Sequence, residues 1–395
     1  MDGPDDELGY LVDPSGTQKR RLIDSAGSRF FYFNCDRICH NGLISSAQRI
    51  AKGFPVNQNE RRLQMEQSIQ GYLGSLQIGE VKLFKNLAMV PVVSDYDDGL
   101  GYITLGEALG AGSIEIREVS EGGSVPELRV VNRAGKMVLI LDGEELVGAK
   151  QNRIVNTTIL VAAGCEIVIP VSCVEQGRWN YKSDVFSSKQ RMMSPSIRQV
   201  KARDVNASLR STGRYRSDQS AIWQEVAGLA SRRGAVSESM DMDRVFDKEA
   251  PVIREYLENF ELVDRQVGAV FLVNGKVVGM DAFGKVMTFS RVFKNLLESY
   301  AMDAVDRFEK ETDAGDGAKA ASDVLAAASA AKAESRPSVG LGMDLRLESE
   351  KLVGFALEHE DRVVHICLFP NAGNRKADSS TRMARDSTRR ERRGV

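Results

Sequence analysis

The sequence lacks the features that mark membrane-spanning, secreted and disulfide-rich proteins. It contains no run of about 18 apolar residues, the length that a membrane-spanning helix needs. Its start, MDGPDDELGY, is acidic and does not have the basic and then apolar pattern of a secretion signal. Five cysteines, an odd number, favour reduced thiols over a disulfide framework. We therefore expect a cytoplasmic protein.

Familiar cofactor motifs are also missing. Neither a Walker motif nor a dinucleotide-binding glycine pattern is present, since Gly340-Leu341-Gly342 is followed by no helix start. Cys35, Cys39 and His40 lie close together, but no second ligand pair at a suitable spacing accompanies them. We expect neither a classical Rossmann domain nor a metal site, and the sequence identifies no cofactor.

Composition and charge indicate a globular protein without a general affinity for polyanions. The 395 residues are enough for one large or two ordinary domains, and 42% are apolar and 27% charged, as in soluble globular proteins. The net charge of -2 gives no whole-molecule attraction to nucleic acid or membrane, so any such attraction must be local.

Residues 136–179 carry the strongest strand signal. Apolar runs at 137–141, 154–161 and 167–174, rich in Val and Ile, predict strands separated by polar segments. Asn274-Gly275 between two further apolar runs predicts a hairpin. Apolar periodicity predicts helices over 219–232, 240–260 and 289–311. The expected fold is α+β, a mainly antiparallel, curled sheet or sandwich with several helices packed on it.

Three segments differ in composition from this core. We predict a partly ordered N-terminal extension over 1–75, a domain over 76–369 and a disordered basic tail over 370–395. Within the domain lies a low-complexity Ala-rich segment, 312–337, in which residues 318–333 form either a loosely packed helix or a mobile insertion. Residues 178–216 hold ten Lys or Arg against two acids and no strand signal. This segment either holds an anionic substrate or is a solvated loop.

The polar segments of 136–179 supply most of the candidate site residues. Glu144 and Glu145 are adjacent, so an extended chain points them to opposite faces. Glu144, directly after Gly143, is the better candidate for a general base or for a ligand of a ribose hydroxyl or a metal. The alternative is a pair of solvated turn carboxylates. Asp281, directly after the second predicted hairpin strand at 276–280, is either catalytic or a turn cap.

Long polar side chains follow in two further groups. In a strand, Gln151 and Arg153 share one face, suited to phosphate or carboxylate, while Asn152 shares the other and braces the backbone. Lys150 precedes them. Glu175, Arg178 and Trp179 end the next strand, where they either stack a base and hold ribose or form an ion pair beside a core tryptophan. Buried roles are expected for the thiols and one histidine, namely Cys165, Cys173, Cys367 and His365.

Several motifs together resemble one known family. DGEELVGAKQNRIVNTTILV followed by IPVSCVEQGRW, and NGKVVGMDAFG followed by LLESYAMDAV, resemble the ARG-and-rhodanese-phosphatase-superfamily-associated protein domain. GLGMDLRLESEKLVGFAL with VVHICLF looks like the closing strands of the same family. The resemblance covers residues 76–306 and 339–369. It implies a link, through accompanying genes, to ADP-ribosylglycohydrolases and to NAD or ADP-ribose metabolism, but it assigns no catalytic residue.

Three hypotheses about function follow. The first is binding, and hydrolysis or modification, of an ADP-ribose- or NAD-derived nucleotide. The second is a non-enzymatic, oligomeric interaction or scaffold protein of a defence or repair system, with local polyanion affinity through 178–216 and 370–395. The third is a metal-dependent hydrolase that uses Glu144, Glu175 and Asp281, for which the spacing is not diagnostic.

Overall fold

The computed structural model describes residues 10–12, 18–20, 58–120, 122–313 and 315–371. The chain divides into two units, Met1–Lys52 and Gly53–Val395. In the first, β1 (Tyr10–Val12) pairs antiparallel with β2 (Gln18–Arg20). The Cys35, Cys39 and His40 group and the tail from residue 372 lie outside the described residues. No helix among the described residues is long and apolar enough to cross a membrane.

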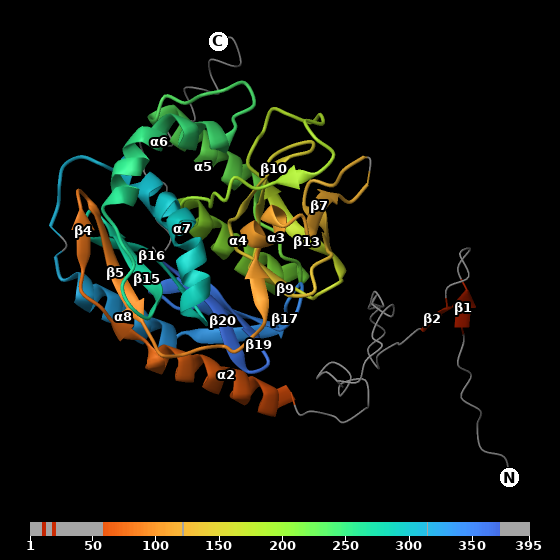
Figure 1. Cartoon of the computed structure of the whole chain (residues 1–395), viewed down its shortest axis with the longest axis horizontal. Coiled ribbons are helices and arrows are strands. Elements are labelled where there is room, and N and C mark those ends of the chain that lie inside the picture. Colours follow the sequence, from red (N-terminus) through yellow and green to blue (C-terminus); the bar gives the residue numbers. More distant parts are fainter. Residues whose placement is uncertain (1–9, 13–17, 21–57, 121, 314, 372–395) are drawn as a thin grey trace. The chain divides into compact units, whose positions relative to one another are not determined.

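The second unit is built on a large antiparallel sheet (Figure 1). Its central hairpin joins β15 (Gln266–Val273) to β16 (Lys276–Phe283) through Asn274 and Gly275, whose φ values of 52° and 70° confirm the predicted turn. In spatial order the strands are β17 (Lys332–Pro337), β18 (Met343–Glu348), β19 (Leu352–His359), β20 (Arg362–Pro370), β16, β15, β5 (Leu87–Val93) and β3 (Gln77–Ile78), with β4 (Lys82–Phe84) also paired to β5.

Helices cover both faces of this sheet. The helix α7 (Val286–Asp306) crosses one face together with α5 (Gln219–Arg232) and α6 (Met242–Glu258), whereas α2 (Gln58–Ser75) and α8 (Gly317–Ser329) cover the other (Figure 1). Along β5, Leu87 and Met89 pack on the α7 side while Val90 packs on the α2 side. Burial on both faces explains why this strand is apolar at every position.

A second group of strands encloses its own core beside the large sheet. A six-stranded sheet has the order β14 (Phe186–Ser187), β10 (Glu145–Gly148), β11 (Arg153–Val155), β13 (Glu166–Cys173), β8 (Glu127–Asn132) and β7 (Ile114–Glu118). A three-stranded sheet has the order β12 (Ile159–Val161), β9 (Met137–Ile140) and β6 (Tyr102–Thr104), with β6 and β9 parallel. The α+β class with mainly antiparallel, curled sheets is confirmed.

Several local predictions need correction. The run 154–161 is two strands, because Asn156, Thr157 and Thr158 interrupt it and turn the chain between the two smaller sheets. A helix, α3 (Leu105–Gly110), follows β6. The cationic segment 178–216, for which a solvated loop is one of the two predictions, contains the helix α4 (Pro195–Thr212). Proline at the first helical position is compatible with a helix start because its missing N–H has no partner there anyway.

The Ala-rich segment 312–337 contains a helix, α8, over Gly317–Ser329, close to the helix predicted over 318–333. It forms α8 and then β17, the edge strand of the large sheet, and Ala321 and Ala328 are buried against the face that α2 covers. The structure therefore supports the helix alternative, but the helix ends at Ser329 and residues Lys332–Pro337 form a strand.

A buried charge network joins α4 to both groups of strands. Arg198 of α4 makes a bidentate ion pair with Asp281 of β16, with N–O distances of 3.0 and 2.7 Å, and its Nε lies 3.3 Å from Asp142, which follows β9. Lys201, one turn further along α4, also pairs with Asp142. All four side chains are inaccessible to solvent or nearly so.

Removing Arg198 should destabilise the whole unit. Arg198→Ala removes the guanidinium that pairs with the buried carboxylates of Asp281 and Asp142. We therefore expect the free energy of unfolding to fall by about 3–5 kcal/mol. Urea denaturation measures it. Arg265→Ala, which breaks an exposed ion pair with Asp95, is the matched control and should leave the midpoint unchanged. Equal effects of the two substitutions would contradict the prediction.

Candidate functional site

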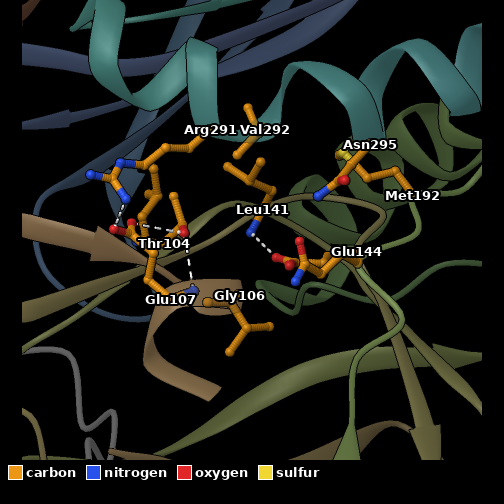
Figure 2. A pocket seen from close by; sticks show the side chains of 12 residues that line it. Thr104, Gly106, Glu107, Leu141, Glu144, Met192, Arg291, Val292 and Asn295 are labelled. Carbon is orange, nitrogen blue, oxygen red and sulfur yellow. Dashed lines mark hydrogen bonds and ion pairs between the residues drawn. The ribbon is translucent and has the colours of Figure 1, made fainter. Parts of the chain in front are cut away.

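A cavity of about 250 Å³ lies between the smaller strands and α7 (Figure 2). It is lined by segments far apart in the sequence: the β6–α3 junction, the end of β9, the turn after it, the loop before α4, and α7. Its polar and charged lining residues are Thr104, Glu107, Glu144, Gln190, Arg291 and Asn295, and its apolar ones include Leu105, Leu139, Leu141, Met192 and Val292.

The turn after β9 places Glu144 in this cavity. Leu141 N–H donates to Glu144 Oε2 at 3.0 Å, and Asn295 of α7 lies on the other side of the carboxyl group in Figure 2. Gly143, which precedes Glu144 in the turn, has φ +78°. A Cβ at Gly143 would lie 3.0 Å from the Arg198 side chain. Because Gly143 adopts this left-handed conformation, Asp142 turns into the buried charge network while Glu144 turns into the cavity.

The environment of Glu144 favours its protonated form. The residue is 7% exposed, and burial raises its pKa to about 7, although the hydrogen bond from Leu141 N–H opposes the shift. Both protonation states are therefore populated near neutral pH, which is the condition for efficient general acid–base chemistry. The neighbouring Glu145 is buried elsewhere, near Asp241 and Asp243, and burial raises its pKa well above the usual range.

The opposite wall of the cavity is fixed by the start of α3. Thr104 and Glu107 form a capping box, in which the Thr104 hydroxyl accepts from Glu107 N–H and the Glu107 carboxylate accepts from Thr104 N–H. Glu107 also pairs with Arg291 of α7 (Figure 2). The Thr104-x-x-Glu107 spacing was the one sequence signal at this wall; nothing in the sequence linked Gln190, Arg291 or Asn295 to Glu144.

The candidates Glu175, Arg178 and Asn152 form a brace beyond the other end of β10. The Arg178 guanidinium donates to Glu175 at 2.9 Å, to the carbonyl groups of Gly148 and Ala149, and to the Asn152 side chain. Asn152 N–H donates to Glu175 at 3.1 Å. Burial alone would raise the pKa of Glu175, but Arg178 and Asn152 lower it. These groups are committed to holding the loop after β10, which supports the ion-pair alternative.

Arg153, Gln151, Lys150 and Trp179 form a second group next to this brace. Arg153 donates to Gln151 at 3.1 Å, so the two side chains share a face as predicted. The Arg153 guanidinium lies 5.5 Å from the centre of the Trp179 ring, as does Lys150 Nζ. Trp179 is 46% exposed, so it is not the core residue of the ion-pair alternative.

Asp281 belongs to the buried network and does not line the cavity. Besides Arg198, it accepts from Tyr300 at 2.8 Å and contacts His365 Nε2 at 3.2 Å. Burial alone would raise the pKa of Asp281, but Arg198 and His365 outweigh it and hold the pKa far below its usual range. His365 is a core histidine, as predicted, with Nδ1 2.8 Å from the Thr158 hydroxyl. These contacts favour a structural role.

The predicted residues therefore lie in three places: Glu144 in the cavity, the loop residues beyond the other end of β10, and Asp281 in the network. Among the described residues, no three His, Cys, Asp or Glu side chains are placed to bind a metal ion together. This arrangement does not favour the metal-dependent hydrolase hypothesis. Cys173 and Cys367 are buried free thiols, as expected, whereas Cys165 is only half-buried.

The cationic segment 178–216 is not an open basic surface. Arg198 and Lys201 are buried in the network, and other cations of the segment pair with acids, from the same loop in the case of Lys182 and from distant elements in the others. These pairs are Lys182–Glu175, Lys189–Asp243, Arg191–Asp243 and Arg210–Glu348. The segment is therefore neither a flexible solvated loop nor a free polyanion-binding patch.

The family resemblance is confirmed. The model of the ARG and Rhodanese-Phosphatase-superfamily-associated Protein domain matches residues 75–369, and the chain belongs to this family. The match runs through the Ala-rich segment 312–337, which the sequence motifs had left outside. No curated protein and no solved structure matches the chain.

The raised pKa of Glu144 predicts a pH-dependent stability. The protonated Glu144 side chain contributes its full stability to the folded state below pH 4.5, the pKa in the unfolded chain. This contribution is lost as the pH rises through about 7, the pKa in the folded protein. The amide side chain of the Glu144→Gln variant does not ionise, so the variant does not lose this stability. The free energy of unfolding of the variant should therefore exceed that of the wild type by a margin that grows with pH, up to about 3 kcal/mol above pH 7. Urea denaturation at pH 5 and pH 8 measures the difference. A difference that does not grow with pH would contradict the prediction.

Proposed function

We propose that this member of the ARG and Rhodanese-Phosphatase-superfamily-associated Protein domain family is an enzyme that binds an ADP-ribose- or NAD-derived nucleotide and hydrolyses its ribosyl bond. Glu144 is the general base that activates the attacking water. The observation that carries the proposal is a carboxyl group with a pKa of about 7 in the wall of a cavity. A pKa near the working pH suits proton transfer in both directions.

The lining of the cavity suits a sugar ring. Asn295 and Gln190 offer amide groups that can pair with ribose hydroxyls, while Leu105 and Val292 add apolar surface. Arg291 lies at the same wall, where it pairs with Glu107 and keeps further N–H groups that suit a phosphate. A volume of about 250 Å³ is smaller than the roughly 300–1,000 Å³ of drug-sized ligand pockets, so it fits the ribose part and not a whole dinucleotide.

The family supports the substrate class. Its description names ARG proteins as associates, and the sequence motifs imply a link to ADP-ribosylglycohydrolases through accompanying genes. Association is a weaker argument than a site, so the chemistry rests on Glu144 and the substrate class on the family.

Glu144→Gln should abolish turnover while leaving substrate binding within a few-fold of wild type. The amide keeps the shape of the side chain but cannot accept a proton, so the rate should fall by about 10²–10⁴. Product release from ADP-ribose and NAD, followed by chromatography, measures the rate, and calorimetry measures binding. The wild-type rate should rise with pH and level off above about 7, because the ionised form of Glu144 is the active one.

Glu358→Gln is the matched control for this experiment. Burial also raises the pKa of Glu358 to about 7, but this residue lies at the end of β19 and does not line the cavity. Its variant should keep the wild-type rate. No binding of either nucleotide at about millimolar concentration by the wild type, or an equal loss of rate in both variants, would refute the proposed function.

A further inference from the structure

The group around Arg153 contains buried polar atoms that the protein does not satisfy. Arg153 has no exposed surface, and Nη1 donates to Gln151. Its Nε and Nη2 have no hydrogen-bond partner among the described residues, although Nη2 lies 3.7 Å from Glu118 Oε1. Oε2 of Glu118, at the end of β7, is equally without a hydrogen bond. Buried polar atoms without a hydrogen bond destabilise the folded protein, so a cluster of three suggests an absent partner.

Two exposed aromatic rings lie over and beside this cluster. Trp179 is 46% exposed and covers the Arg153 guanidinium, and Tyr181 is 48% exposed. Lys150 Nζ lies 5.5 Å from the first ring and 5.0 Å from the second. The rings belong to residues 174–185, which form neither helix nor strand. Exposed aromatic rings next to cations are typical of surfaces that stack a heterocyclic base.

Gly123 lets the loop after β7 pack closely against this group. A Cβ at Gly123, where φ is +75°, would lie 3.3 Å from the Trp179 ring, 3.2 Å from the Lys150 side chain and 3.4 Å from Glu118 Oε2. The loop after β7 therefore approaches the three side chains as closely as a backbone without a side chain allows.

The unsatisfied atoms specify the chemistry of the missing partner. The guanidinium needs a hydrogen-bond acceptor, and the adjacent carboxylate of Glu118 needs a donor. A simple anion would satisfy Arg153 but would meet the negative charge of Glu118, and a simple cation would do the reverse. An amide offers a carbonyl oxygen beside an N–H, and on an aromatic ring it also offers a face for Trp179.

We propose that Arg153, Glu118 and Trp179 form a binding site for a heteroaromatic amide of the nicotinamide type. The carbonyl oxygen accepts from Arg153, the amide N–H donates to Glu118, and the ring stacks on the Trp179 indole, which swings out to admit it. The site is separate from the Glu144 cavity and does not depend on the reaction proposed there.

Tryptophan fluorescence tests the site directly, because Trp179 and Trp223 are the two tryptophans of the chain. In a Trp223→Phe background, nicotinamide should change the emission of Trp179 saturably, with a dissociation constant in the millimolar range typical of small fragments. Nicotinate, which carries a carboxylate in place of the amide, should bind at least about fivefold more weakly because of Glu118. A linear response without saturation, or equal affinity for the two compounds, would overturn the site.

Three variants locate the binding site and test its chemistry. In the Trp223→Phe background, Glu118→Gln removes the negative charge and should reverse the preference, so that nicotinate binds better than nicotinamide. By calorimetry, Trp179→Ala should weaken nicotinamide binding at least about fivefold through lost stacking. Phe308→Ala, which removes another exposed aromatic ring (45%) at a distant position, is the control and should bind like wild type. Equal affinities of these two alanine variants, or an unchanged preference in Glu118→Gln, would overturn the proposal.

Glu144→Gln separates this site from the proposed function. Nicotinamide should change Trp179 emission in this variant as it does in the wild type. If the Glu144 substitution removes the signal, nicotinamide binds in the cavity and the proposed site is wrong. Nucleotide turnover without any nicotinamide signal would overturn this site alone and leave the function of Glu144 standing.

Discussion

The ion pair between Arg198 and Asp281, with Asp142 as the second acceptor, is the interaction on which the arrangement of this protein depends. It joins α4 to a central strand of the large sheet and to the turn after β9 of the smaller one. Buried charges are tolerated only when each is paired. The helix α4, the strand β16 and the turn after β9 must therefore take the one relative position in which all of these charges are paired. Lys201 also pairs with Asp142, so the network contains two cations and two anions.

This network also determines where Glu144 lies. Asp142 and Glu144 are two residues apart, yet one is held by two cations and the other has a hydrogen bond from Leu141 N–H in the wall of a cavity. Gly143 separates the two environments because its left-handed backbone lets the turn pack against Arg198. A carboxyl group with a pKa near 7 is thus held by a turn whose neighbouring residue is fixed by ion pairs. Such rigid support is what a catalytic group requires.

The sequence predicted the features that depend on local pattern and missed those that depend on distant partners. Strand periodicity and the Asn274-Gly275 turn gave the antiparallel sheets, and Glu144 was singled out beside Gly143. The helix α4 was missed because Arg198 and Lys201 resemble residues of a solvated segment until Asp142 and Asp281 are seen to neutralise them. The cavity could not be predicted, since its walls come from segments separated by up to about half of the chain.

The two proposed sites lie at opposite ends of one short strand. Glu144 directly precedes β10, and Lys150 follows its end, so they are separated by about six residues, or roughly 20 Å if fully extended. This length is an upper limit, since the chain is not extended throughout: Gly148 and Ala149 have φ values of 128° and 37°. Nicotinamide is bonded directly to its ribose, so the two sites suit two separate small molecules, as their independence in the proposals above requires. The rigid turn holds Glu144 at one end of the strand, and the brace of Arg178, Glu175 and Asn152 holds the loop at the other end. Each site is therefore supported by its own set of buried contacts, and neither needs the other to be occupied.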